Sequence, residues 1–286
     1  MSTSFLKSNQ GLFIPDNTEP CAAIKRTTHL GIGAHQDDLE FMALEGILAG
    51  YQQDSKWFGG IICTDGANSA RLGPYANYSD ASMQRVRERE QEAAAVVGQY
   101  AFVAQLAYPS SVAKSAAPRH AMVGDLARLI ELAAPDIVYA HNPFDKHATH
   151  VGVFKATLDA ILSLPVDQRP QQLIGCEVWR GLDWLPDDLK LIQNLTERGN
   201  IAAALNGIFD SQISGGKRYD LAVEGRRMAN ATFLDAFNTD QVQRCAYGID
   251  LSALILEPGI PINAFIEETL KQFQQNVIDT LTEVCR

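Results

Sequence analysis

A histidine and two carboxylates stand within four residues of one another in the run His35-Gln36-Asp37-Asp38-Leu39-Glu40. Imidazole and carboxylate groups are ligands for zinc, and a second carboxylate beside them can serve as a base. Aspartates also cap helices for reasons unrelated to catalysis, so this run alone is compatible with a metal site and with a capping loop. The chemistry that it could support is metal-assisted hydrolysis.

A second group of such residues follows about a hundred positions later. Three of the six histidines, His141, His147 and His150, fall within ten residues and flank Asp145. His147 and His150 are three residues apart near the start of a predicted helix, so they can face the same way. Two groups of metal-ligating residues in one chain favour a functional site over isolated structural histidines.

The predicted elements bring both groups to one place. Strands and helices alternate through the first half of the chain: we predict strands at 27–34, 57–63, 101–107 and 137–140, and helices at 41–51, 81–99, 122–134 and 151–162. Alternation of this kind is typical of an α/β fold, here a Rossmann-like, mostly parallel sheet with helices on both faces. Each histidine group directly follows a predicted strand, and ligands of such sheets bind at the carboxyl ends of the strands.

We predict a single domain over residues 1–286. Residues 1–26 are expected to form an irregular N-terminal arm, residues 27–165 the core that carries the metal site, and residues 166–286 a C-terminal part that completes the pocket. In this last part the pattern predicts strands at 173–179 and 192–195 and helices at 200–210, 219–237 and 263–285. The amphipathic spacing of the last helix predicts core packing or a dimer surface.

Composition excludes several classes of protein. The net charge of −10 argues against a nucleic-acid partner, which would require a basic face. Five scattered cysteines with no CxxC pair indicate neither a disulfide framework nor a thiolate zinc site. No apolar run is long enough for membrane insertion and no signal peptide is recognised, so we expect a cytoplasmic protein.

The chain resembles the LmbE-like, PIG-L-type N-acetylglucosaminyl deacetylase superfamily over residues 28 to 160. The run from Ala34 to Glu40 is similar to the family motif Ala-His-Pro-Asp-Asp-x-Glu, with Gln36 in place of proline. His147-Ala148-Thr149-His150 is similar to the family motif His-x-Asp-His, with Thr149 in place of aspartate. The Thr64-Asp65-Gly66 turn and the pair Arg87-x-x-Glu90 also resemble the family.

The resemblance implies a role for each matching residue. His35, Asp38 and His150 would bind the metal, zinc by preference, although two histidines and a carboxylate also suit iron(II). Asp37 would be the general base, and His147 would stabilise the oxyanion and help to protonate the leaving amine. Because Thr149 replaces the aspartate that usually partners this histidine, Asp145 is the candidate for that orienting role.

The resemblance further implies a small N-acylated substrate, an N-acetyl group on a glucosamine-like sugar. Arg71, Arg87 and Asn142 are the polar candidates for substrate contacts, and Trp179 is a candidate for the pocket wall. A homo-oligomer is the expectation for the family.

Two other functions remain open at this point. One is a non-haem iron oxygenase with a facial triad of two histidines and a carboxylate, and the other is a non-catalytic, Rossmann-like ligand-binding module. A dinucleotide site is not supported, because Gly31-Ile32-Gly33 is not followed by the third glycine of that fingerprint.

Overall fold

The computed structural model describes residues 11–257 and 259–286, and its centre is an eight-stranded sheet with the order β1-β4-β3-β2-β5-β6-β8-β7. The strands are β1 (Leu12–Phe13), β2 (His29–Gly33), β3 (Phe58–Thr64), β4 (Phe102–Tyr108), β5 (Ile137–His141), β6 (Gln172–Cys176), β7 (Lys190–Asn194) and β8 (Cys245–Asp250). Pairing is parallel from β4 through β3, β2 and β5 to β6, whereas β1, β8 and β7 pair antiparallel with their neighbours. The sheet is therefore mixed.

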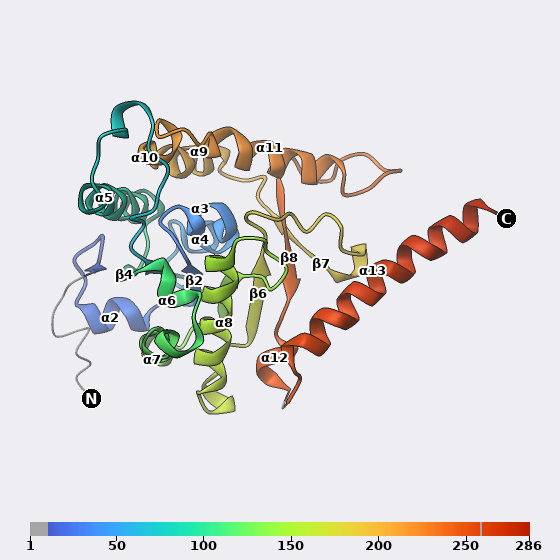
Figure 1. Ribbon diagram of the computed structural model, residues 1–286, viewed down its shortest axis with the longest axis horizontal. Helices are drawn as coiled ribbons and strands as arrows, with labels where there is room; N and C mark the ends of the chain where they lie inside the picture. Colours follow the sequence, from blue (N-terminus) through green and yellow to red (C-terminus); the bar gives the residue numbers. More distant parts are fainter. Residues whose placement is uncertain (1–10, 258) are drawn as a thin grey trace.

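Helices cover both faces of this sheet (Figure 1). They are α2 (Pro20–Lys25), α3 (Asp38–Met42), α4 (Leu44–Gly50), α5 (Asp80–Gly98), α6 (Ser110–Ala113), α7 (Ala116–Ala133), α8 (Ala148–Leu162), α9 (Gly199–Gly207), α10 (Asp210–Ile213), α11 (Tyr219–Thr232), α12 (Ala253–Leu256) and α13 (Ile262–Val284). Helices α2, α7 and α8 lie on one face, and α3, α4, α5 and α9 lie on the other.

Side chains that alternate along the strands pack into two apolar cores, one on each face of the sheet. In β5, Val138 and Ala140 belong to the core beneath α7 and α8, while Tyr139 between them belongs to the core beneath α4 and α9. Burial on both faces explains why the central strands read as continuous apolar runs in the sequence.

The alternation predicted for residues 27–165 agrees with β2, β3, β4 and β5 and the helices between them, but the helix starts differ. The helix expected from Phe41 begins at Asp38 and is interrupted at Ala43, and α7 begins at Ala116. Helix α8 begins at Ala148, three residues earlier than expected, so that His150 lies in its first turn.

The prediction was weaker at the two ends of the chain. The expected irregular arm contains β1, which pairs with β4, and the short helix α2; residues 1–10 of that arm lie outside the described residues. In the C-terminal part β8 was not predicted, and α11 ends at Thr232 rather than continuing to Phe237.

The C-terminal helix α13 projects from the body of the molecule (Figure 1). Phe265 and Ile266 near its start pack against the core, whereas Leu281 and Val284 near its end are exposed. Core packing thus holds for its first turns only, and a homo-oligomer stays a prediction. Among the described helices, none has the length and apolar character needed to cross a bilayer.

The order of strands places a crevice beside β2. The chain passes from β2 to β3 on one side, while β5 pairs with β2 on the other side. Ligands of open α/β sheets bind at such a switch point, outside the carboxyl ends of the strands. Both histidine groups of the sequence follow these two neighbouring strands.

Candidate active site

The loop after β2 holds the first group of donors. Asp38 is the first residue of α3, and its Oδ2 accepts backbone N–H bonds from Ala34 at 3.0 Å and from His35 at 2.7 Å. These bonds fix the buried carboxylate beside the half-buried imidazole of His35.

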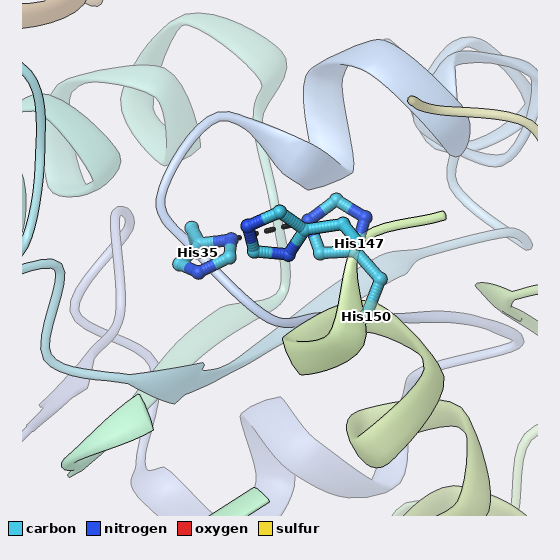
Figure 2. Close-up of side chains that lie close together, drawn as sticks. All are labelled: His35, His147 and His150. Atoms are coloured by element: carbon cyan, nitrogen blue, oxygen red, sulfur yellow. Dashed lines mark hydrogen bonds between the residues drawn. The ribbon is translucent and has the colours of Figure 1, made fainter. Parts of the chain in front are cut away.

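The second group enters from the end of β5 and the start of α8. His147 is the N-cap residue of α8, and His150 is in the first turn. Figure 2 shows the rings of His35, His147 and His150 gathered together, with the dashed line joining His35 Nδ1 and His150 Nε2 at 3.2 Å.

The three residues expected to bind the metal have donor atoms at suitable separations. His35 Nδ1 is 3.3 Å from Asp38 Oδ2, and His150 Nε2 is 3.5 Å from Asp38 Oδ1. A tetrahedral zinc ion with bonds of about 2.0–2.1 Å separates its ligand atoms by about 3.3–3.4 Å. The contacts of His35 and His150 use different oxygens of Asp38, so the donor chemistry suits zinc but the three residues do not form one compact triad. Among the described residues, the donor groups close enough to share one ion are His35, His147 and His150, and Asp38, His141 and His150.

Asp145 contacts His150 more closely than the sequence suggested. Its Oδ2 lies 3.1 Å from His150 Nδ1, and its Oδ1 accepts the backbone N–H of His147 at 3.1 Å. A hydrogen bond from Nδ1 of His150 directs Nε2 toward the other donors. The expectation that Asp145 orients the ring of His147 was wrong, because its contact there is with the backbone.

The ring of His147 consequently lacks a carboxylate partner. Its Nδ1 is buried and has no hydrogen-bond partner among the described residues. Burial, with the nearby His150 and His35, lowers the pKa of His147 to about 4. Thr149, which stands where the family has aspartate, supplies no charge to counter this.

Asp37, the expected base, is held by residues of α5. Its carboxylate pairs with Arg87 at 3.3 Å, and its backbone N–H donates to Gln91 Oε1 at 3.2 Å. Its φ of 97° lies in the region that favours glycine, a strain that is found preferentially at functional sites. Burial raises the pKa of Asp37 above its usual range, although Arg87 acts in the opposite direction.

Gln91 also secures the end of the first motif. Its Nε2 donates to the buried Glu40 at 2.8 Å, and Tyr100 donates to the same oxygen at 2.7 Å. Burial raises the pKa of Glu40 to about 7. Glu40 thus anchors α3 to α5 and does not line the pocket.

His141 was counted in the sequence but given no role. It is fully buried, stacks on His150 with ring centroids 3.9 Å apart, and places Nε2 3.2 Å from Asp38 Oδ2. The only signal for it was its position directly after the predicted strand at 137–140; it is the last residue of β5, and its contact with Asp38 depends on the pairing of β5 with β2.

The three predicted substrate contacts have different environments. Arg87 lines the pocket but is paired with Asp37. Arg71 binds Asp80 and the carbonyl oxygens of Ala67 and Tyr78 and does not line the pocket. Asn142 is buried away from the pocket, where it donates to the carbonyl oxygen of Cys176.

The pocket above these groups has a volume of about 560 Å³ and receives walls from the C-terminal part. Trp179 stacks on His147 at 5.9 Å between ring centroids, and Tyr219 meets Trp179 edge-on. Trp179 and other residues between 177 and 246 line this cavity. That the C-terminal part completes a functional pocket stays a prediction.

The segment that carries both histidine groups matches the model of a known protein family. Residues 30–161 match the family model described as GlcNAc-PI de-N-acetylase, PIG-L. This segment of the chain is thus similar to the PIG-L family. The match confirms the resemblance inferred from the two motifs, and it covers both strands and both loops that carry the donors. A comparison with curated protein sequences gave no significant match.

Solved structures share the fold well beyond the PIG-L segment. N,N'-diacetylchitobiose deacetylase from Pyrococcus horikoshii superposes with a TM-score of 0.63 at 14% identity, over 81% of this chain and 86% of its own. The 4-carboxy-2-hydroxymuconate hydratase of Pseudomonas putida KT2440 gives 0.61 at 14% identity, over 82% and 98%. The conserved protein TT1542 from Thermus thermophilus gives 0.60 at 18% identity, over 79% and 94%. At these identities the likeness concerns the fold alone.

Proposed function

We propose that this protein is a zinc-dependent N-deacetylase that removes an acetyl group from an N-acetylated, glucosamine-like substrate. The observation that carries the proposal is the cluster of donors around His150, whose Nε2 lies 3.2 Å from His35 Nδ1 and 3.5 Å from Asp38 Oδ1, with the Asp37 carboxylate lining the same pocket. The PIG-L match over residues 30–161 supports the same reaction.

The metal and the base have separate tasks in this proposal. Zinc, or iron(II), held by the three donors would supply Lewis acidity and lower the pKa of a water molecule toward about 7. Asp37 takes the proton from the attacking water, and Arg87 holds its carboxylate in place. The water oxygen adds to the acyl carbon to give a tetrahedral oxyanion. The oxyanion collapses, the bond from that carbon to nitrogen breaks and the nitrogen takes up a proton, giving acetate and a free amine.

His147 has a narrower role than the resemblance implied. No carboxylate hydrogen-bonds to its ring within the described part of the chain. Asp38 and Asp145 raise its pKa, but burial and the neighbouring His150 and His35 outweigh them, so the neutral ring is favoured. A neutral His147 can still donate one N–H to the oxyanion. The proton that reaches the leaving nitrogen then comes from Asp37, which received it from water.

The fold alone does not select hydrolysis, because one of the similar structures is that of a hydratase. The products separate the two reactions, since a deacetylase releases acetate and amine in equal amounts and a hydratase releases neither. The oxygenase and the ligand-binding module are also less well supported, because the PIG-L match covers the whole donor set.

The test combines metal analysis with turnover. Purified protein, reconstituted with zinc, is assayed for acetate and amine release from N-acetylated sugars, alongside Asp37→Asn. We expect about one metal ion per chain in both proteins, and turnover that falls by about 10²- to 10⁴-fold in the variant. Retained turnover in Asp37→Asn would show that the base is misassigned, and a failure to bind zinc would exclude the proposed reaction.

A further inference from the structure

One face of α11 forms the wall of the pocket beyond the metal donors. Tyr219, Ala222, Val223, Arg226 and Arg227 line the cavity, and their spacing places them along one side of the helix. The wall therefore begins with an aromatic ring, continues with small apolar side chains and ends at two guanidinium groups.

Arg227 is a buried cation with unused hydrogen-bonding capacity. It is 2% exposed, and its Nη2 donates to the carbonyl oxygens of Glu40 at 2.7 Å and Phe41 at 3.2 Å. Its Nε and Nη1 have no partner in the described residues, and no carboxylate lies within ion-pair distance of it there. Glu224 and Glu177 act on Arg227 only from beyond ion-pair distance, so a directly hydrogen-bonded anion would further stabilise this buried cation.

Two lysines add positive charge at the mouth of the same cavity. Lys114 follows α6 and Lys217 precedes α11; both are exposed and form no ion pair within residues 11–257 and 259–286. The Lys217 Nζ lies 5.3 Å from the centroid of the Trp179 ring, which also stacks on His147. Trp179 therefore links the lysine to the histidine cluster.

None of the acidic residues that line the described pocket forms an ion pair with Arg227, Lys114 or Lys217. Asp37 is paired with Arg87, and Asp38 accepts two backbone N–H bonds beside its histidine neighbours. Glu177 accepts hydrogen bonds from Asn230, from the backbone of Tyr247 and from the backbone of Leu182. In a chain with a net charge of −10, unpaired cations around one cavity are a local feature of this pocket.

We infer that the α11 side of the pocket binds an anionic group, a carboxylate or a phosphate, carried by the N-acetylated substrate. The inference rests on the proposed deacetylation and adds the class of substrate to it. Arg227 and Lys217 would form charge-assisted hydrogen bonds to the anion, while Trp179 and Tyr219 would flank the ring between the anion and the acetyl group.

Three sugars that differ in one substituent test this directly. N-acetylglucosamine is neutral, N-acetylmuramic acid adds a carboxylate, and N-acetylglucosamine 6-phosphate adds a phosphate. We expect the zinc-loaded enzyme to prefer at least one of the anionic sugars over the neutral one by about tenfold or more in kcat/KM, as for a hydrogen bond to a charged group. The better of the two identifies the anion.

The lysine variants locate the effect. Lys217→Met, alone and with Lys114→Met, should reduce the ratio of anionic to neutral kcat/KM by about three- to tenfold, mainly through KM for the anionic sugar. Lys271→Met on α13 is the matched control at an exposed lysine outside the pocket, and it should leave the ratio unchanged. Arg227 is not the residue to vary first, because it also binds the end of α3.

The outcomes separate this inference from the proposed function. Turnover of all three sugars with no anionic preference would overturn the anion site and leave the deacetylase intact. Release of acetate from none of them would count against the deacetylase, and calorimetry with glucosamine, glucosamine 6-phosphate and muramic acid then tests the site without turnover. Binding of an anionic sugar that weakens in Lys217→Met would support the site, and equal or absent binding of all three would overturn it.

Discussion

Replacing Asp145 with asparagine tests how the metal donors are held in position. The carboxylate is buried and accepts three hydrogen bonds: from His150 Nδ1 at 3.1 Å, from the backbone of Trp179 at 3.3 Å and from the backbone of His147 at 3.1 Å. The first two reach Oδ2 and the third reaches Oδ1. An amide retains only one oxygen, so one of these donors must face an NH₂ group.

The size of the effect follows from this arrangement. With the amide oxygen toward His150, the backbone N–H of His147 loses its acceptor, which costs about 1–3 kcal/mol of stability with or without metal. The charge that makes His150 a stronger ligand is also lost. Partners of ligating histidines typically contribute about 10- to 100-fold to metal affinity, so we expect zinc to bind Asp145→Asn more weakly by that factor.

Competition with a chromophoric chelator measures the zinc affinity of both proteins. Asp159→Asn is the matched control, because Asp159 lies on α8, the helix that carries His150, but pairs with Lys155 and does not line the pocket. We expect the control to bind zinc like the unaltered protein. Equal zinc affinity in Asp145→Asn and in the unaltered protein would refute the assignment of Asp145 to His150.

Three further predictions concern metal, packing and pH. Removal of metal by a chelator should lower the thermal unfolding midpoint, and added zinc should restore it. In His150→Ala the midpoint should not respond to zinc. A full response in that variant would mean that His150 is not a ligand. In Gly152→Ala the new Cβ would lie 2.3 Å from the carbonyl oxygen of Ala113, so the free energy of unfolding measured in urea should fall by about 1–3 kcal/mol. Gly207→Ala is the control, because its new Cβ has nothing within 4 Å and the free energy of unfolding should not fall. Equal stability of the two alanine variants would mean that α6 and α8 can separate at little cost. Burial lowers the pKa of His29 below its ordinary value of 6.5. As the pH falls below 6.5, His29 in the unfolded chain takes up a proton more readily than His29 in the folded chain. The free energy of unfolding therefore decreases as the pH drops through 6.5. The unfolding midpoint of metal-free His29→Gln should therefore fall less between pH 7 and pH 5 than that of the unaltered protein, and parallel pH curves would contradict the assignment.

The central part of the fold was predictable because its signals are local. Continuous apolar runs marked β2, β3, β4 and β5, and amphipathic spacing marked the helices between them. The convergence of His35 and His150 followed from the strand-end rule, without knowledge of the strand order.

The remaining parts depend on pairings that the sequence does not encode locally. Strand β8 joins the sheet antiparallel between β6 and β7, and its six residues include Gly248, so the segment carries no strong strand pattern. The antiparallel strands make the sheet mixed, which strand-helix alternation alone does not predict. Arg227 likewise lines the pocket only because α11 packs across the end of α3.

Asp145 shows how a small error in a boundary changes a residue's role. A helix predicted from Val151 leaves residues 145–150 as a loop in which either histidine could meet the carboxylate. In the structure Asp145 Oδ1 accepts the N–H of His147 two residues on, and α8 begins at Ala148. The helix then carries His150 back over the turn, where its Nδ1 meets the other carboxylate oxygen.

The two departures from the family motifs have different physical consequences. Gln36, in place of proline, donates from Nε2 to Gln105 at 3.1 Å and to the carbonyl oxygen of Thr64 at 3.4 Å, so side-chain bonds restrain a loop that a proline ring would stiffen. Thr149, in place of aspartate, has no such substitute, because Asp145 is engaged with His150. In the proposed reaction this leaves His147 as a neutral hydrogen-bond donor, and both proton transfers fall to Asp37. Removing the Asp37 carboxylate should therefore cost more turnover than removing the His147 ring.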